Sequence, residues 1–173
     1  MGRPKRTTHA NRMAHCFIHA MAGIWFNETD KMVLMETLRI LVERHGYKIV
    51  YFSLMSNHCH WIMEFTEDKS CGDVLGNVHT CLSKAYNKLH KRHGHVWRDR
   101  YKDVTIEEDS HCLSAITYVA LNSLRSGAIK RVEDDVYSSY RAYAYGHKDG
   151  ITSLPSIYET LGRTEQERGE EYP

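Results

Sequence analysis

A run of alternating residues at positions 58–65 limits the fold more than any other feature of this sequence. Its odd-numbered members, Cys59 through Phe65, are all apolar, whereas its even-numbered members begin with His58 and His60. Alternation with a period of two is typical of a β-strand, whose side chains point to opposite faces. The sequence therefore predicts a strand that packs one face on a core and presents two imidazoles side by side on the other.

The neighbouring segments place this strand in a defined series of elements. Alternating or β-favouring residues predict strands at 14–20, 47–55, 58–65 and 101–107. Apolar residues at helical spacing predict a helix from Met32 to a C-cap at Gly46, a long amphipathic helix at 72–93 that ends at Gly94, and a helix from Asp109 or Ser110 to about Ser126. The order β-α-β-β-α-β plus a helix indicates an α+β fold of the ferredoxin-like, split βαβ type. We expect an antiparallel sheet with two helices on one face and an open face for a site.

Size and composition indicate one domain. A chain of 173 residues with 42% hydrophobic content can bury one sizeable core. We expect a basic arm at 1–13, a catalytic domain at 14–130 and a C-terminal extension at 131–173, with a short helix near Ser156–Leu161. The sequence has no apolar run long enough to span a membrane, and its polar start does not resemble a signal peptide. Five cysteines without a CxxC pair favour a reducing compartment, so we expect a cytoplasmic protein without membrane association.

Positive charge is clustered although the net charge is only +1. Basic residues gather in the N-terminal arm, in the long amphipathic segment and just after it, and acids gather at 133–135 and in the tail. Such a distribution fits a phosphate-binding surface, while a solvated helix face is the alternative for any single cluster. The candidate DNA-contacting residues are Arg3, Lys5, Arg6, Lys84, Lys88, Lys91, Arg98, Arg100 and Lys102.

His58 and His60 form a candidate metal site. Side chains two positions apart on a strand stand roughly 7 Å apart, close enough for both imidazoles to bind one ion. The strand directs Cys59 to the opposite face, which argues against a structural zinc site. Glu64 shares the histidine face, where it is either a ligand or base or, more simply, a carboxylate at the solvent edge.

Tyr118 and Asn122 lie four residues apart and should share a helix face. A tyrosine phenol, with a pKa of about 10, is a weak nucleophile unless it is activated. A divalent cation that binds a scissile phosphate supplies charge stabilisation and orientation. Tyrosine, asparagine and two histidines therefore suggest a nucleophile beside a metal, although a tyrosine among apolar helix residues is usually part of the core.

Four segments carry a resemblance to a known family: LMSNHCHWIMEF, GHVWRDRYKDVTIEED, TYVALNSLRSG and VYSSYRAYAYG. In this order and spacing they resemble the single-tyrosine HUH transposases, most closely the REP-associated tyrosine transposases of bacteria. The resemblance covers about residues 12–146. Two positions depart from the family pattern, since Ser56 replaces a proline and Asn122 is followed by Ser-Leu-Arg-Ser-Gly where Pro-Val-Arg-Ala-Gly is usual. These changes affect loop geometry and substrate preference and leave the reactive side chains in place.

The resemblance implies a metal-dependent endonuclease that acts in DNA transposition and recombination. It makes His58, His60 and Asn122 ligands of Mg²⁺ or Mn²⁺, and Tyr118 the nucleophile that forms a 5′-phosphotyrosine. The implied partners are single-stranded DNA and a DNA hairpin with a short adjacent tetranucleotide, bound by a monomer or a homodimer. The protein would then associate with the bacterial nucleoid when bound to DNA.

Two other functions use the same residues differently. A rolling-circle nickase shares the His-x-His and tyrosine chemistry but usually carries more domains. A domesticated hairpin-binding protein would cut nothing and would not need all three reactive side chains. In the extension, the tyrosines near Arg141 either stack on unpaired bases or pack the extension onto the core, and packing is the simpler interpretation: Tyr137, Tyr140, Tyr143 and Tyr145.

Overall fold

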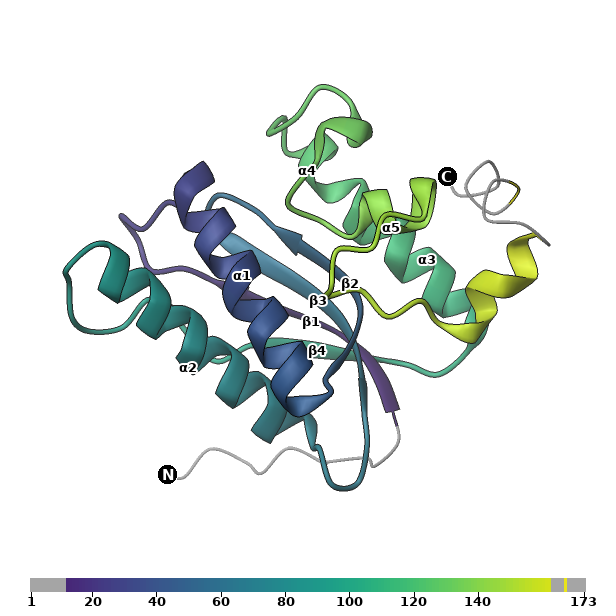
Figure 1. Cartoon of the computed structure of the whole chain (residues 1–173), viewed down its shortest axis with the longest axis horizontal. Coiled ribbons are helices and arrows are strands. Elements are labelled where there is room, and N and C mark those ends of the chain that lie inside the picture. Colours follow the sequence, from purple (N-terminus) through teal and green to yellow (C-terminus); the bar gives the residue numbers. More distant parts are fainter. Residues whose placement is uncertain (1–11, 163–166, 168–173) are drawn as a thin grey trace.

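A computed structural model describes residues 12–162 and Glu167. Four strands form one sheet in the order β2-β3-β1-β4, and every neighbouring pair is antiparallel. The strands are β1 (Arg12–His19), β2 (Lys48–Leu54), β3 (His58–Phe65) and β4 (Lys102–Ile106). This arrangement confirms the predicted α+β, split βαβ fold, with β1 at the centre of the sheet between β3 and β4 (Figure 1).

Two long helices cover one face of the sheet (Figure 1). They are α1 (Glu28–His45) and α2 (Cys71–Leu89). Asn27 begins α1 with a capping box shared with Asp30, and Gly46 ends it in the left-handed conformation that favours glycine. The apolar residues of β3, including Cys59 and Trp61, lie in the core beneath these helices. This is the side to which the sequence directs the odd-numbered residues of β3.

The opposite face carries shorter elements that follow β4 in the sequence. They are α3 (Asp109–Ala120), α4 (Asn122–Arg125), α5 (Tyr140–Tyr145) and two 3-10 helices, Val132–Asp134 and Ser156–Leu161. A second apolar cluster joins α3 and α5 to the sheet. Within it Tyr143 is fully buried and its hydroxyl donates to the Val50 carbonyl oxygen at 2.9 Å. Most of the extension's tyrosines therefore pack on the core, but Tyr145 is exposed.

Three helices differ from their predicted bounds. The first begins at Glu28 rather than Met32, because Asn27 caps it. The second long helix ends at Leu89 rather than near His93, because His90 leaves it to pair with Asp30 of α1 at 2.5 Å and Lys91 adopts a positive φ. The predicted single helix at 110–126 divides at Leu121 into α3 and α4. Gly127 has the expected positive φ and follows this pair of helices. No pattern in the sequence predicted α5.

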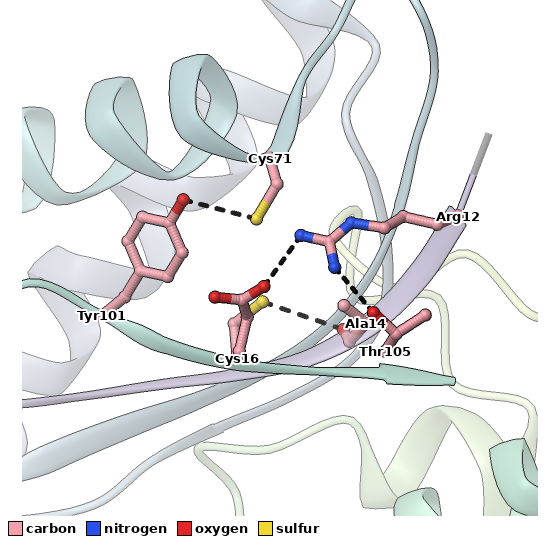
Figure 2. A network of polar contacts seen from close by, with 7 residues as sticks. Arg12, Ala14, Cys16, Cys71, Tyr101 and Thr105 are labelled. Carbon is pink, nitrogen blue, oxygen red and sulfur yellow. Dashed lines mark hydrogen bonds and ion pairs between the residues drawn. The ribbon is translucent and has the colours of Figure 1, made fainter. Parts of the chain in front are cut away.

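A polar network joins β1 to the edge strand β4 near the start of β1 (Figure 2). The Arg12 guanidinium donates to Asp103 Oδ2 at 2.8 Å and to Thr105 Oγ1 at 2.7 Å, and both partners lie on β4. Nearby, the Cys71 thiol lies 3.5 Å from the Tyr101 hydroxyl. All five cysteines of the chain are free thiols, and four of them are buried. No helix in the described part of the chain is long and apolar enough to span a membrane.

Candidate active site

Four histidines meet where β1 and β3 lie side by side. His58 and His60 project from β3 toward the face that carries α3, as their spacing predicts. The antiparallel register places His19 opposite His58 and Phe17 opposite His60. The rings of the four histidines stack in pairs. Their centroids are 5.0 Å apart for His19 and His58 and 5.2 Å apart for His15 and His60.

Sequence reasoning missed His15 and His19. A signal was present, because His15, Phe17 and His19 alternate along a predicted strand in the same way as the pair on β3. What the sequence could not supply is the pairing of β1 with β3, which brings the two sets together. The site is thus larger than the motif on one strand.

Each histidine of β3 has its Nδ1 atom held by a neighbour. Asn57 Oδ1 lies 2.7 Å from His58 Nδ1, and because an amide oxygen only accepts, this nitrogen carries the proton. His60 Nδ1 lies 2.9 Å from His15 Nε2, and Asn122 Nδ2 donates to His60 Nε2 at 2.7 Å. A ring that accepts at Nε2 donates from Nδ1, so His60 donates to His15. His58 therefore keeps its Nε2 lone pair for a ligand, whereas the Nε2 lone pair of His60 accepts from Asn122.

Burial keeps these imidazoles neutral. It lowers the pKa of His60 to about 3, with further contributions from His15, His58 and His19. Burial and His19 lower the pKa of His58 to about 4, and burial lowers the pKa of His15. The pKa of His19 is lowered by burial and then by Arg98 and Lys102. At neutral pH all four rings are in the uncharged form that binds metal ions.

Tyr118 stands beside this cluster on the last turn of α3. Its ring meets the His15 ring edge-on, with centroids 5.9 Å apart, and the Arg125 guanidinium carbon lies 5.6 Å from the centre of the Tyr118 ring. The side chain is 48% exposed and borders a shallow pocket of about 230 Å³ that His15 also lines. Tyr118 is therefore not a core residue, and its phenol is accessible to a ligand.

Asn122 enters the site from the first position of α4, just after the break at Leu121. The next residue, Ser123, is buried with its hydroxyl 3.5 Å from Ser53 Oγ on β2, and Ser53 pairs with His60 across the sheet. Buried Asp135 of the extension also interacts with Ser123, and burial raises the pKa of its carboxyl group. The turn that presents Asn122 is thus held from both the sheet and the extension.

The donor atoms present fit a divalent cation. Within residues 12–162, no three or more His, Cys, Asp and Glu side chains form a group that could hold a metal ion. The predicted ligands are His58, His60 and Asn122, and the amide of Asn122 is not one of these side-chain types. The two imidazoles are neutral, and Asn122 lies within hydrogen-bond distance of His60. Glu64 is paired with Lys48 at 3.1 Å, and Cys59 is buried on the other face.

A comparison with known protein families adds to the geometry of the site. The sequence model of the family described as IS200-like transposase matches residues 15–122, from the first histidine of this cluster to its asparagine. The chain belongs to the IS200-like transposase family. No curated protein matches the sequence significantly.

Solved structures show the fold relationship of this transposase. A REP-associated tyrosine transposase bound to a REP hairpin is similar with a TM-score of 0.71 and 14% identity, covering 90% of this chain and 93% of that chain. A structure described as a transposase from Deinococcus radiodurans has a TM-score of 0.49 and 14% identity, covering 64% of this chain and 91% of that one. At this level of identity, the first likeness concerns the fold.

The predicted DNA-contacting residues of the transposase form four groups, the first two of which share Lys84. Lys84, Arg98 and Arg100 line a groove of about 700 Å³ between α2 and the segment before β4. Lys84, with Lys88 and Lys91, lines an adjoining hollow of about 440 Å³. Lys102 instead lies on the histidine face of β4, with Nζ 5.9 Å from the centre of the Phe17 ring. The remaining three, Arg3, Lys5 and Arg6, lie outside the described residues.

Proposed function

We propose that this transposase cleaves and rejoins single-stranded DNA beside hairpins, with Tyr118 as the nucleophile. The observation that carries the proposal is the convergence of three groups from different elements: the two neutral imidazoles of His58 and His60 on β3, the Asn122 amide of α4, and an exposed tyrosine whose ring contacts His15. A structural tyrosine would be buried, and within residues 12–162 the Nε2 lone pair of His58 accepts no hydrogen bond.

In this proposal His58, His60 and Asn122 hold Mg²⁺ or Mn²⁺. The bound cation supplies polarisation of the scissile phosphate and stabilisation of the charge that develops on it. The two imidazole nitrogens suit Mn²⁺ better than Mg²⁺, because Mg²⁺ prefers oxygen ligands such as an amide oxygen. His15 and Asn57 accept from the two Nδ1–H groups and so fix the orientation of both rings.

Tyr118 carries the covalent step. Its phenolic oxygen forms a bond to the phosphorus while the bond from phosphorus to the 3′ oxygen breaks. The phenol loses a proton and the departing 3′ oxygen gains one, which leaves a 5′-phosphotyrosine and a free 3′-OH. Because one phosphoester bond replaces another, a second 3′-OH can reverse the step and rejoin strands without ATP.

One chain contains every proposed catalytic group. The ring of Tyr118 contacts His15 of the same chain, and Asn122 reaches His60 of the same chain. The proposal is therefore a monomer that cleaves in cis, although the family resemblance also allows an exchanged dimer. Mixing an inactive Tyr118→Phe chain with an inactive His60→Ala chain tests this, because only an exchanged dimer regains activity.

Hairpin DNA is the proposed partner. The transposase with the similar fold was solved with a REP hairpin, and the cations of the groove offer phosphate contacts without sequence readout. Arg98 and Lys102 also lower the pKa of His19, which places positive charge within electrostatic reach of the histidine cluster. Binding should weaken steeply with salt, since each neutralised phosphate releases counterions.

The test uses labelled single-stranded hairpins from the flanks of the protein's own gene, with Mn²⁺ or Mg²⁺, on a denaturing gel. We expect a metal-dependent, slowly migrating covalent adduct that is absent in Tyr118→Phe. Tyr145→Phe is the matched control, because Tyr145 is an exposed tyrosine away from the histidines, and it should form the adduct normally. Hairpin binding without any adduct or cut strand would instead indicate a non-catalytic hairpin-binding protein, and cleavage by Tyr118→Phe would exclude this nucleophile.

A further inference from the structure

The loop between β1 and α1, residues 20–27, presents two large apolar side chains to solvent. Trp25 is 64% exposed and Met21 is 41% exposed. The other two tryptophans of the chain behave differently: Trp61 is fully buried, and Trp97 packs on the core with its indole N–H donating to the His79 carbonyl oxygen. An exposed tryptophan contributes little to the stability of the fold, because its large apolar surface stabilises a protein mainly when buried.

This loop is held firmly against the ends of the sheet. Ala20 N–H donates to the Asn57 carbonyl oxygen at 2.8 Å, and Phe26 N–H donates to the Ser56 carbonyl oxygen at 2.6 Å. The Phe26 ring packs beside Tyr86 in the core. Trp25 is therefore fixed by its neighbours while its own ring stays free. The backbone contacts place the loop beside the turn that leads into the histidines of β3.

Positive charge adjoins this loop. Met21 N–H donates to the Val96 carbonyl oxygen at 2.8 Å, and Met21 lines the same groove as Lys84, Arg98 and Arg100. Arg98 N–H in turn donates to the His19 carbonyl oxygen, at the end of β1 nearest the histidine cluster. An apolar surface and a cationic groove lie together, next to the candidate active site. Proteins that hold single strands combine these two features, cations for the backbone and an aromatic ring for a base.

We propose that Trp25, in the same loop as Met21 of the groove, is a stacking platform for an unpaired base of the DNA strand whose phosphates lie in the groove. The inference rests on the proposed function in taking single-stranded DNA as the ligand, and it adds a contact that the reactive residues do not provide. A base face offers no hydrogen-bond pattern, so the platform favours unpaired over paired nucleotides without choosing among the four bases. Its role is to hold the single strand next to the histidine cluster.

Tryptophan fluorescence tests the platform directly, without metal and without cleavage. The ligands are a hairpin with a single-stranded flank and the same hairpin with a blunt end. We expect the flanked hairpin to quench wild-type fluorescence strongly. Trp25→Phe should lose most of this quenching yet keep its affinity within about threefold, because phenylalanine still stacks. Trp25→Ala should bind the flanked hairpin about tenfold more weakly and the blunt hairpin unchanged, as the loss of one base stack predicts.

Tyr145→Ala is the matched control, because it removes another exposed aromatic ring from a helix outside the groove and should not change affinity. Thermal unfolding of each variant verifies that the fold is intact. Equal affinity of Trp25→Ala and wild type for the flanked hairpin would overturn the platform while leaving the proposed function standing. An equal loss on both hairpins would also overturn it, because the contact would not be to an unpaired base. If wild type bound neither hairpin, the platform and the proposed function would both fail.

Discussion

His15 Nε2 lies 2.9 Å from His60 Nδ1, so a side chain of β1 orients an imidazole of β3. Replacing His15 by alanine should lower Mn²⁺ affinity about 10- to 100-fold, the usual effect of losing a group that holds a ligating histidine. Gln at this position should restore part of the affinity, because its amide oxygen can accept from Nδ1–H. Titration of Mn²⁺ followed by electron paramagnetic resonance measures the affinity without any DNA. His147→Ala, an exposed histidine elsewhere, is the control, and unchanged affinity in His15→Ala would contradict the positioning role.

Arg125 stands over the Tyr118 ring, with 5.6 Å between its guanidinium carbon and the ring centre. A cation over an exposed aromatic face contributes about 0.5–1 kcal/mol. We therefore expect Arg125→Ala to slow adduct formation roughly two- to fivefold in single-turnover experiments, with hairpin affinity changed less than the rate. Arg131→Ala removes an exposed arginine that pairs with Glu133 and serves as the control. A larger loss of affinity than of rate would assign Arg125 to DNA binding instead.

His79 makes the core sensitive to acid. It is buried in α2 and accepts from the Trp61 indole N–H at 3.2 Å, and burial lowers its pKa to about 3. As the pH falls below the unfolded value of about 6.5, the unfolded chain takes up a proton that the folded chain refuses, so stability falls by up to about 1.4 kcal/mol per pH unit. Above that value this loss is absent.

The variant His79→Gln cannot titrate but can still accept from Trp61. Urea unfolding at about pH 7.5 and about pH 5.5 should show a smaller acid loss in this variant than in wild type, by roughly 1 kcal/mol. Identical losses in the two proteins would mean that His79 is protonated in the folded state or does not carry the pH dependence.

The Arg12 and Asp103 pair stabilises the junction of β1 and β4, where the two side chains are 9% and 14% exposed. Asp103→Ala should lower the free energy of unfolding by about 3 kcal/mol, because it leaves a mostly buried guanidinium without its carboxylate. The double variant Arg12→Met with Asp103→Leu should recover most of this loss, since it removes both charges together. Urea unfolding of Arg12→Met, Asp103→Leu and the double variant gives the coupling energy, and additive losses would show that the pair is not coupled.

The alternation of apolar and polar residues was sufficient to predict the strands of the sheet and the face of β3 that packs on the core. Alternation at 58–65 predicts which residues face the core, and the structure buries Cys59 and Trp61 on that side. Periodicity was not sufficient for the ends of helices. The end of α2 depends on a contact between His90 and Asp30, which are 60 residues apart, and no local pattern contains such information.

The candidate site was likewise predicted only in part. Local spacing identified His58 and His60, and the resemblance assigned roles to Tyr118 and Asn122. The groups that orient the rings came from elsewhere: His15 from a strand 45 residues earlier and Asn57 from the turn before β3. The exposure of Tyr118 was also beyond the sequence, because apolar neighbours on its helix suggest a core position.

The position of β1 between β3 and β4 has a consequence for folding during synthesis. Met13 of β1 pairs with Ile106 of β4. The first described strand therefore cannot pair with β4 until nearly two thirds of the chain has been synthesised. Sheets built from contacts so distant in sequence form late and slowly. A nascent chain on the ribosome thus carries both histidines of β3 well before the strand and helices that complete the candidate site. Under the proposed function, the order of synthesis prevents cleavage until the segment that carries Tyr118 and Asn122 has been made.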